Sequence, residues 1–162
     1  MTPWRPCWVI VSKDLPLQLD ATIRSLRSNC DDIASAYILV LYVASTPAFA
    51  AGYRVLTNEH PGVEFLRESD FKVELIRLIE GTSHVMFLVD DTLFVGSLSL
   101  AQAIKVLDDD PACLGFSFRL GRNTTYCYTL DKYQRLPAFE ELSSGVLTFD
   151  WTDAEHDFGY PL

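Results

Sequence analysis

The chain has 162 residues, of which 49% are hydrophobic, so it is long and apolar enough for one globular domain with a buried core. A formal net charge of −9 argues against nucleic acid as a partner, because a phosphate backbone demands a basic protein face. The longest apolar runs, such as residues 36–44, are too short to span a bilayer, and residues 7–11 do not form a secretory signal. Four cysteines without C-x-x-C spacing fit a reduced, cytoplasmic compartment.

Apolar strands and amphipathic helices alternate along the first half of the chain. Residues 7–11 are apolar throughout and predict a central strand, which ends at Ser12-Lys13-Asp14. A helix is expected from Leu15-Pro16, with Asp14 as its cap. Residues 36–43 predict a second strand, and Ser45-Thr46-Pro47 predicts the start of the next helix.

The same alternation continues to the middle of the chain. Residues 63–66 predict a short strand, and Ser69-Asp70 predicts the start of a helix. That helix is expected to bury Phe71, Leu75, Leu78 and Ile79. Residues 84–89 form an apolar run typical of a central strand covered on both faces, and the run stops at two adjacent acids, Asp90 and Asp91.

Less regular elements follow these acids. Ser97 is expected to cap a helix that turns Leu98, Ala101, Ile104 and Leu107 inward. Residues 112–120 predict a further strand, and residues 126–128 and 146–149 predict short ones. Strand and helix alternate at least four times, so the fold class is α/β, with a mostly parallel central sheet and helices on both faces.

Polar side chains stand at the carboxyl ends of three predicted strands. These are Ser12-Lys13-Asp14, Ser45-Thr46 and Asp90-Asp91. Because the carboxyl ends of parallel strands lie at one edge of the sheet, the three clusters are expected to converge at a ligand crevice. Two acids there can hold a divalent cation or a ribose hydroxyl, or they can simply begin a turn. The glycine-rich phosphate loops of dinucleotide and triphosphate sites are absent from the sequence.

These residues resemble a known family. The first strand leading into Ser12-Lys13-Asp14, with Phe87-Leu88-Val89-Asp90-Asp91 later in the chain, looks like the N-terminal part of a GT-A glycosyltransferase. The resemblance is to the family-2-like members of the nucleotide-diphospho-sugar transferase superfamily. It implies a single Rossmann-like GT-A domain over residues 1–162 that binds a nucleotide sugar, with a UDP-sugar as the expected donor and Mn²⁺ or Mg²⁺ as cofactor.

The resemblance also implies roles for single residues. Ser12, Lys13, Asp14 and Ser45 would line the base pocket, and Lys72 would reach the base or the phosphates or remain a solvated helix lysine. Asp90 would face the ribose, and Asp91 would hold the metal that bridges the diphosphate.

Candidate catalytic residues lie near the C-terminus. An inverting transferase needs a carboxylate to deprotonate the acceptor hydroxyl. The candidates are Asp153, Glu155 and Asp157, with His156 as a further metal ligand or base; a solvated acidic tail is the competing interpretation.

Three features depart from the family pattern. Thr92 stands where many members carry a third acid, and Ser45 stands where many place an acid that reads the base. The chain is also short, so the acceptor-binding part is expected to be missing or minimal.

Two other functions stay open from the sequence. One is a non-catalytic nucleotide-binding or assembly module with a degenerate GT-A fold, which could be a homo-oligomer. The other is a receiver-like or phosphatase-like domain with Asp90 as phosphoacceptor. The absence of an acidic pair after the first strand counts against the second.

Overall fold

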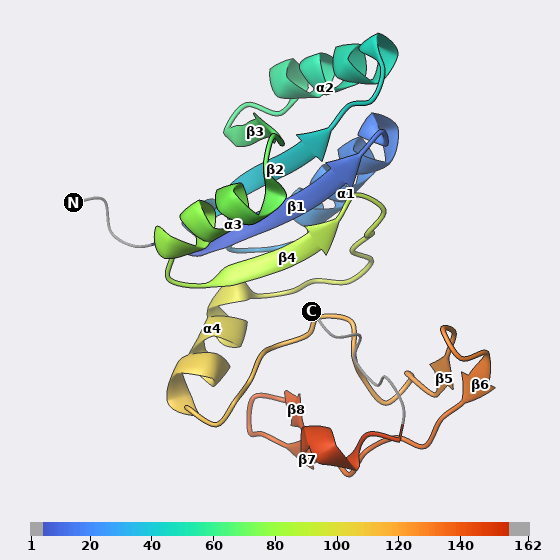
Figure 1. Cartoon of the computed structure of the whole chain (residues 1–162). Helices are drawn as coiled ribbons and strands as arrows, with labels where there is room; N and C mark the ends of the chain where they lie inside the picture. Colours follow the sequence, from blue (N-terminus) through green and yellow to red (C-terminus); the bar gives the residue numbers. More distant parts are fainter. Residues whose placement is uncertain (1–4, 156–162) are drawn as a thin grey trace. The chain divides into compact units, whose positions relative to one another are not determined.

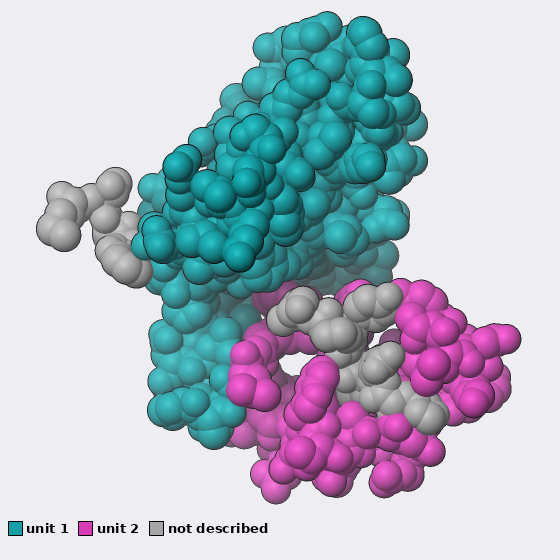
Figure 2. Space-filling view, in the orientation of Figure 1, with its two compact units in different colours: residues 1–113 teal, residues 114–162 magenta. Residues whose placement is uncertain are grey.

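The computed structural model describes residues 5–155, and the chain divides into two compact units, residues 1–113 and 114–162 (Figure 2). The first unit holds a four-stranded parallel sheet in the order β3-β2-β1-β4. Its strands are β1 (Cys7–Lys13), β2 (Tyr37–Val43), β3 (Val63–Arg67) and β4 (Val85–Val89). The predicted α/β class is therefore confirmed, and the arrangement is Rossmann-like.

Helices cover both faces of this sheet (Figure 1). The helices of this unit are α1 (Pro16–Asn29), α2 (Pro47–Glu59), α3 (Phe71–Glu80) and α4 (Leu100–Asp109), with a short 3₁₀ turn, η1 (Ile33–Ser35). On one face Leu75 and Leu78 of α3 pack on buried Val9 and Leu39. On the other, α1 and α2 bury Leu19, Ile23, Leu26, Tyr53 and Leu56. Every helix of the described residues is too short or too polar to cross a membrane.

The position of β4 differs from the prediction for residues 84–89. The interior strands are β2 and β1, and β4 pairs only with β1, so β4 is an edge strand among the described residues. Phe87 and Val89 of β4 are 40% and 53% exposed. An apolar run reports how much surface a strand can bury, but it does not specify the strand's neighbours.

The described part of the second unit, residues 114–155, contains only short elements. Its strands pair antiparallel as β5 (Tyr126–Cys127) with β6 (Lys132–Tyr133) and as β7 (Glu140–Glu141) with β8 (Leu147–Thr148), and a 3₁₀ turn, η2 (Trp151–Asp153), follows. The strand predicted over residues 112–120 was wrong, because this segment has no ladder partner among the described residues. A strand is stabilised by its partner, and the local pattern does not contain that partner.

The predicted N-caps of α1 and α4 also need correction. Helix α1 begins after Leu15 and has no side-chain cap, because the Asp14 carboxylate bonds to Ser45 instead. The N-cap of α4 is Ser99 in place of Ser97, so the buried residues shift to Leu100 and Ala103.

The buried stripe of α3 is narrower than predicted. Phe71 and Ile79 are exposed, since only the middle of the helix contacts the sheet. The predicted caps at Thr46 and Asp70 are confirmed.

Candidate functional site

The polar ends of β1, β2 and β4 meet at one edge of the sheet, as the sequence predicted (Figure 1). The Ser12 hydroxyl donates to Asp90 Oδ2 at 2.7 Å, which joins β1 to the end of β4. The Ser45 amide donates to Asp14 Oδ1 at 2.7 Å, which joins β1 to the end of β2. We call the set formed by Ser12, Lys13, Asp14, Ser45, Asp90 and Asp91 the polar edge.

The two adjacent acids have opposite environments. Asp90 is 7% exposed, and its Oδ2 atom also accepts the Lys13 amide at 3.2 Å. Asp91 is exposed and has no hydrogen-bond partner within residues 5–155. Burial and these bonds give Asp90 a structural environment unlike that of an open phosphoacceptor. Of the two acids, only Asp91 faces the solvent.

Tyr53 of α2 supports the polar edge from its buried side, a role that the sequence did not predict. Its hydroxyl lies 2.6 Å from Ser12 Oγ and accepts the Leu15 amide at 3.3 Å. Burial raises the pKa of Tyr53, so the hydroxyl keeps its proton. Its ring stacks on Tyr42 with 4.2 Å between the ring centroids. One chemical argument could have identified Tyr53: a tyrosine on the buried face of a helix needs a hydrogen-bond partner for its hydroxyl.

Asp14 is held as an ionised carboxylate at the surface. The Ser45 hydroxyl and amide both donate to it, and these bonds lower its pKa; the nearby Lys13 ammonium adds to the effect. Asp14 also adopts a φ of 60°, a left-handed conformation that few residues other than glycine take. Ser45 therefore orients Asp14 within the polar edge.

The two lysines of the predicted site are exposed. Lys13 presents its side chain to solvent beside Asp14. Lys72 lies in the first turn of α3, which also begins at the carboxyl end of the sheet. A further cation that the sequence analysis did not single out is Arg67 at the end of β3, whose guanidinium donates to the Ala44 carbonyl at 3.3 Å.

The candidate catalytic residues belong to the second unit or lie outside the described residues. Asp153 is exposed in η2, and the Glu155 carboxylate accepts the Arg135 amide at 2.5 Å. His156 and Asp157 lie outside residues 5–155.

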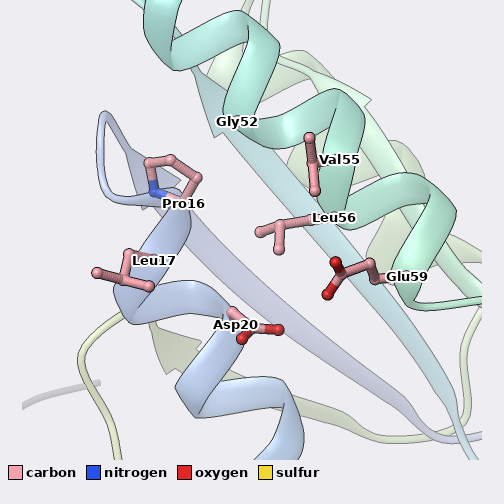
Figure 3. Close-up of a pocket in the computed structure, with 7 residues that line it drawn as sticks. All are labelled: Pro16, Leu17, Asp20, Gly52, Val55, Leu56 and Glu59. Atoms are coloured by element: carbon pink, nitrogen blue, oxygen red, sulfur yellow. The ribbon is translucent and has the colours of Figure 1, made fainter.

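A pocket of about 340 Å³ lies in the helix layer between α1 and α2 (Figure 3). Asp20 and Glu59 stand at one end of it, and both pair with the Arg24 guanidinium, at 2.9 and 2.8 Å. None of the polar-edge residues lines this pocket. Its lining is Pro16, Leu17, Asp20, Gly52, Val55, Leu56 and Glu59.

The fold and site define an α/β protein with a Rossmann-like sheet whose strand ends form a polar edge. No family model matches the chain. Among curated proteins, it is similar to Bifunctional glycosyltransferase pgtA of Dictyostelium discoideum, with 28% identity over 94% of this chain. The chain spans 22% of the length of that relative. The GT-A family-2 assignment stays a prediction.

Proposed function

We propose that the polar edge binds the nucleoside diphosphate of a nucleotide sugar, with a UDP-sugar as donor, in a glycosyltransferase that passes the sugar to an acceptor hydroxyl. The observation that carries the proposal is the pair of adjacent acids with opposite environments, one tied to β1 and one free to meet a ligand. The name of the curated relative supports the reaction class.

In this proposal, different residues of the polar edge contact different parts of the nucleotide sugar. Ser12, Lys13, Asp14 and Ser45 line the base pocket, and Asp90 stands nearest the ribose. Lys72 extends from the start of α3 toward the base or the phosphates. The ionised Asp14 suits a base that presents N–H donors, because a carboxylate is a hydrogen-bond acceptor only.

The donor set at Asp91 fits a divalent cation that arrives with the nucleotide. Within residues 5–155, no group of three or more histidine, cysteine or acidic side chains is arranged to hold a metal. Mg²⁺ at phosphate sites takes one or two carboxylates, substrate phosphates and water, and a single exposed Asp91 matches that pattern. When bound, the cation would act as a Lewis acid that offsets the charge on the leaving diphosphate.

The transfer itself needs an acceptor base. The acceptor oxygen would bond to the anomeric carbon while the bond from that carbon to the diphosphate breaks, and the diphosphate leaves with the electron pair. Asp153, Glu155 or Asp157 would take the acceptor proton in an inverting reaction, and His156 is the alternative base or an added metal ligand.

Calorimetric titration of UDP into the protein tests the donor site, first with Mn²⁺ and then with chelator. We expect binding that requires Mn²⁺ and is lost in Asp91→Ala. Asp31→Ala is the matched control, because Asp31 is an exposed acid that follows α1 at the other end of the sheet. Failure of the wild-type chain to bind UDP under either condition would overturn the proposal.

Activity separates the transferase from a non-catalytic module. A panel of UDP-sugars with Mn²⁺ is incubated with the protein, and release of UDP is measured. UDP release that Asp91→Ala abolishes supports the transferase. Metal-dependent UDP binding without release from any donor favours the nucleotide-binding module.

A further inference from the structure

We infer that Thr22, Ser12 and Asp90 are positioning residues that fix the direction of Asp91. The inference rests on the proposed function, since it takes Asp91 as the metal ligand. It gives Asp90 a role beyond its place nearest the ribose, because Oδ2 of this buried acid is bonded within the protein to the Ser12 hydroxyl and the Lys13 amide. Thr22 has no place in the site as predicted from sequence.

The two acids occupy the middle of a tight turn. The Thr92 amide donates to the Val89 carbonyl at 3.3 Å, so Asp90 and Asp91 are the two central residues between them. In such a turn, the direction of the second side chain depends on the peptide plane that joins the two residues. Asp91 can hold a cation reproducibly only if this plane is fixed.

The carboxylate of Asp90 anchors one side of the turn to β1. Its Oδ2 atom accepts the Ser12 hydroxyl at 2.7 Å and the Lys13 amide at 3.2 Å. The single hydroxyl proton of Ser12 is used in this bond, so Tyr53 must donate to Ser12 Oγ across their 2.6 Å contact. Tyr53 therefore donates to Ser12, and Ser12 donates in turn to the Asp90 carboxylate.

Thr22 anchors the peptide itself. Its hydroxyl donates to the Asp90 carbonyl at 2.7 Å, and this carbonyl belongs to the peptide that joins Asp90 to Asp91. Thr22 is 0% exposed and lies inside α1, so it cannot touch a ligand. With the carboxylate and the carbonyl both held, rotation of the peptide plane is blocked. Groups that orient a metal ligand in this way strengthen metal binding without contacting the metal.

The test replaces the hydroxyl of Thr22 by a methyl group and measures the affinities for Mn²⁺ and for uridine. For Thr22→Val, we expect the affinity for Mn²⁺ at saturating UDP to fall about 10-fold, the loss typical of groups that orient metal ligands. The affinity for uridine, followed by NMR chemical shifts, should stay unchanged, because uridine has no phosphates to share the cation. Thr22→Ser keeps the hydroxyl and should retain Mn²⁺ affinity.

Thr57→Val is the matched control. The Thr57 hydroxyl donates to the Tyr53 carbonyl at 3.0 Å within α2, so the same substitution breaks a bond that does not reach Asp90. It should leave both affinities unchanged. If Thr22→Val does not fold, comparison of Thr22→Ala with Thr22→Ser isolates the same hydroxyl.

Each remaining outcome overturns a defined claim. Unchanged Mn²⁺ affinity in folded Thr22→Val overturns the inference while leaving the donor site intact. Equal losses of affinity for uridine and for Mn²⁺ in Thr22→Val also overturn it, since they would show that Thr22 supports the structure of the whole site and not the direction of Asp91. A wild-type chain that does not bind UDP with Mn²⁺ overturns the proposed function and this inference together.

Discussion

Asp14 and Ser45 lie 31 residues apart in sequence, yet two hydrogen bonds join them, one from the Ser45 amide and one from its hydroxyl. The contact ties the end of β1 to the residue that follows β2. It also accompanies the left-handed backbone of Asp14, a conformation that persists only where its surroundings hold it. The geometry of the polar edge therefore depends on the Asp14–Ser45 pair. The sequence instead predicted Asp14 as the cap of α1.

Ser45→Ala should move the pKa of Asp14 upward toward its ordinary value of 3.8, because the hydroxyl bond is the largest cause of the lowered pKa. The amide bond remains, so part of the lowering should persist. A carboxyl NMR titration measures the change. The pKa of Asp32, whose hydrogen-bond partners do not include Ser45, should stay lowered and serves as the control. An unchanged Asp14 pKa would contradict the assignment.

The sign of the pH dependence follows from this lowered pKa. A carboxyl whose pKa is lower in the folded state stabilises the fold above its unfolded pKa, and the stabilisation is lost as the pH falls through the folded value. The contribution of Asp14 should therefore be complete at neutral pH and disappear only in acid. In Ser45→Ala this pH-dependent contribution should be smaller, as measured by urea unfolding at several pH values.

The sequence predicted the strand ends correctly because local signals mark them. Apolar runs stop at Ser12, Ser45 and Asp90, and the parallel sheet brings those stops together. It could not predict that Tyr53 and Thr22 support the edge. Both residues fit the helical periodicity of core positions, and their hydroxyl partners come from other elements.

The errors in the predicted fold also come from contacts between segments that are far apart in the sequence. The edge position of β4 and the absence of a strand at residues 112–120 both depend on which chain segment pairs with which. Pairing is a non-local choice, whereas hydrophobic periodicity reports only local amphipathicity. The shift of the α4 cap from Ser97 to Ser99 also has a non-local component, since Asp32 bonds the first amides of that helix.

Tyr53→Phe should destabilise the protein by about 1–2 kcal/mol, because it removes the donor of the buried bond to Ser12 and the acceptor of the Leu15 amide. Urea unfolding measures the loss. Tyr37→Phe is the control: Tyr37 is a half-exposed residue whose ring lies under the Arg5 guanidinium, and its change should stay within about 0.5 kcal/mol. Equal effects of the two substitutions would show that the Tyr53 hydroxyl contributes no stability.

Asp32→Ala should destabilise α4 by about 1 kcal/mol, the typical value of a helix N-terminal cap. The Asp32 carboxylate accepts the Leu100 and Ala101 amides at 2.9 and 2.7 Å and also the Ser99 hydroxyl. Burial alone would raise the pKa of Asp32, but these bonds outweigh it and the pKa is lowered.

The difference in unfolding free energy between wild type and Asp32→Ala should therefore depend on pH. It should be full at neutral pH, above the unfolded pKa, and shrink as the pH falls through the lowered folded pKa. Urea unfolding of both proteins at about pH 7 and in acid measures it. A difference independent of pH would mean that the loss comes from helix propensity or packing, with no contribution from the charged cap.

Gly52→Ala should test the close packing of α1 on α2. A Cβ at position 52 would lie 2.7 Å from Cγ of Pro16, and a proline ring has little freedom to move away. Overpacking of this kind costs about 1–3 kcal/mol, whereas replacing a helical glycine by alanine gains about 1 kcal/mol. We expect a net loss of about 1 kcal/mol in urea unfolding. Gly96→Ala is the control, because no atom lies within 4 Å of its added Cβ.

The same substitution should also disturb the polar edge. Pro16 begins α1 directly after the Asp14-Leu15 turn, and Tyr53 follows Gly52 in α2, so separation of the helices would lengthen the Tyr53–Ser12 contact. Gly52→Ala should therefore weaken UDP binding with Mn²⁺ as well as stability, while Gly96→Ala should change neither. A stabilised Gly52→Ala protein would mean that α1 and α2 accommodate the added methyl group. Unchanged UDP binding would mean that the polar edge tolerates their movement.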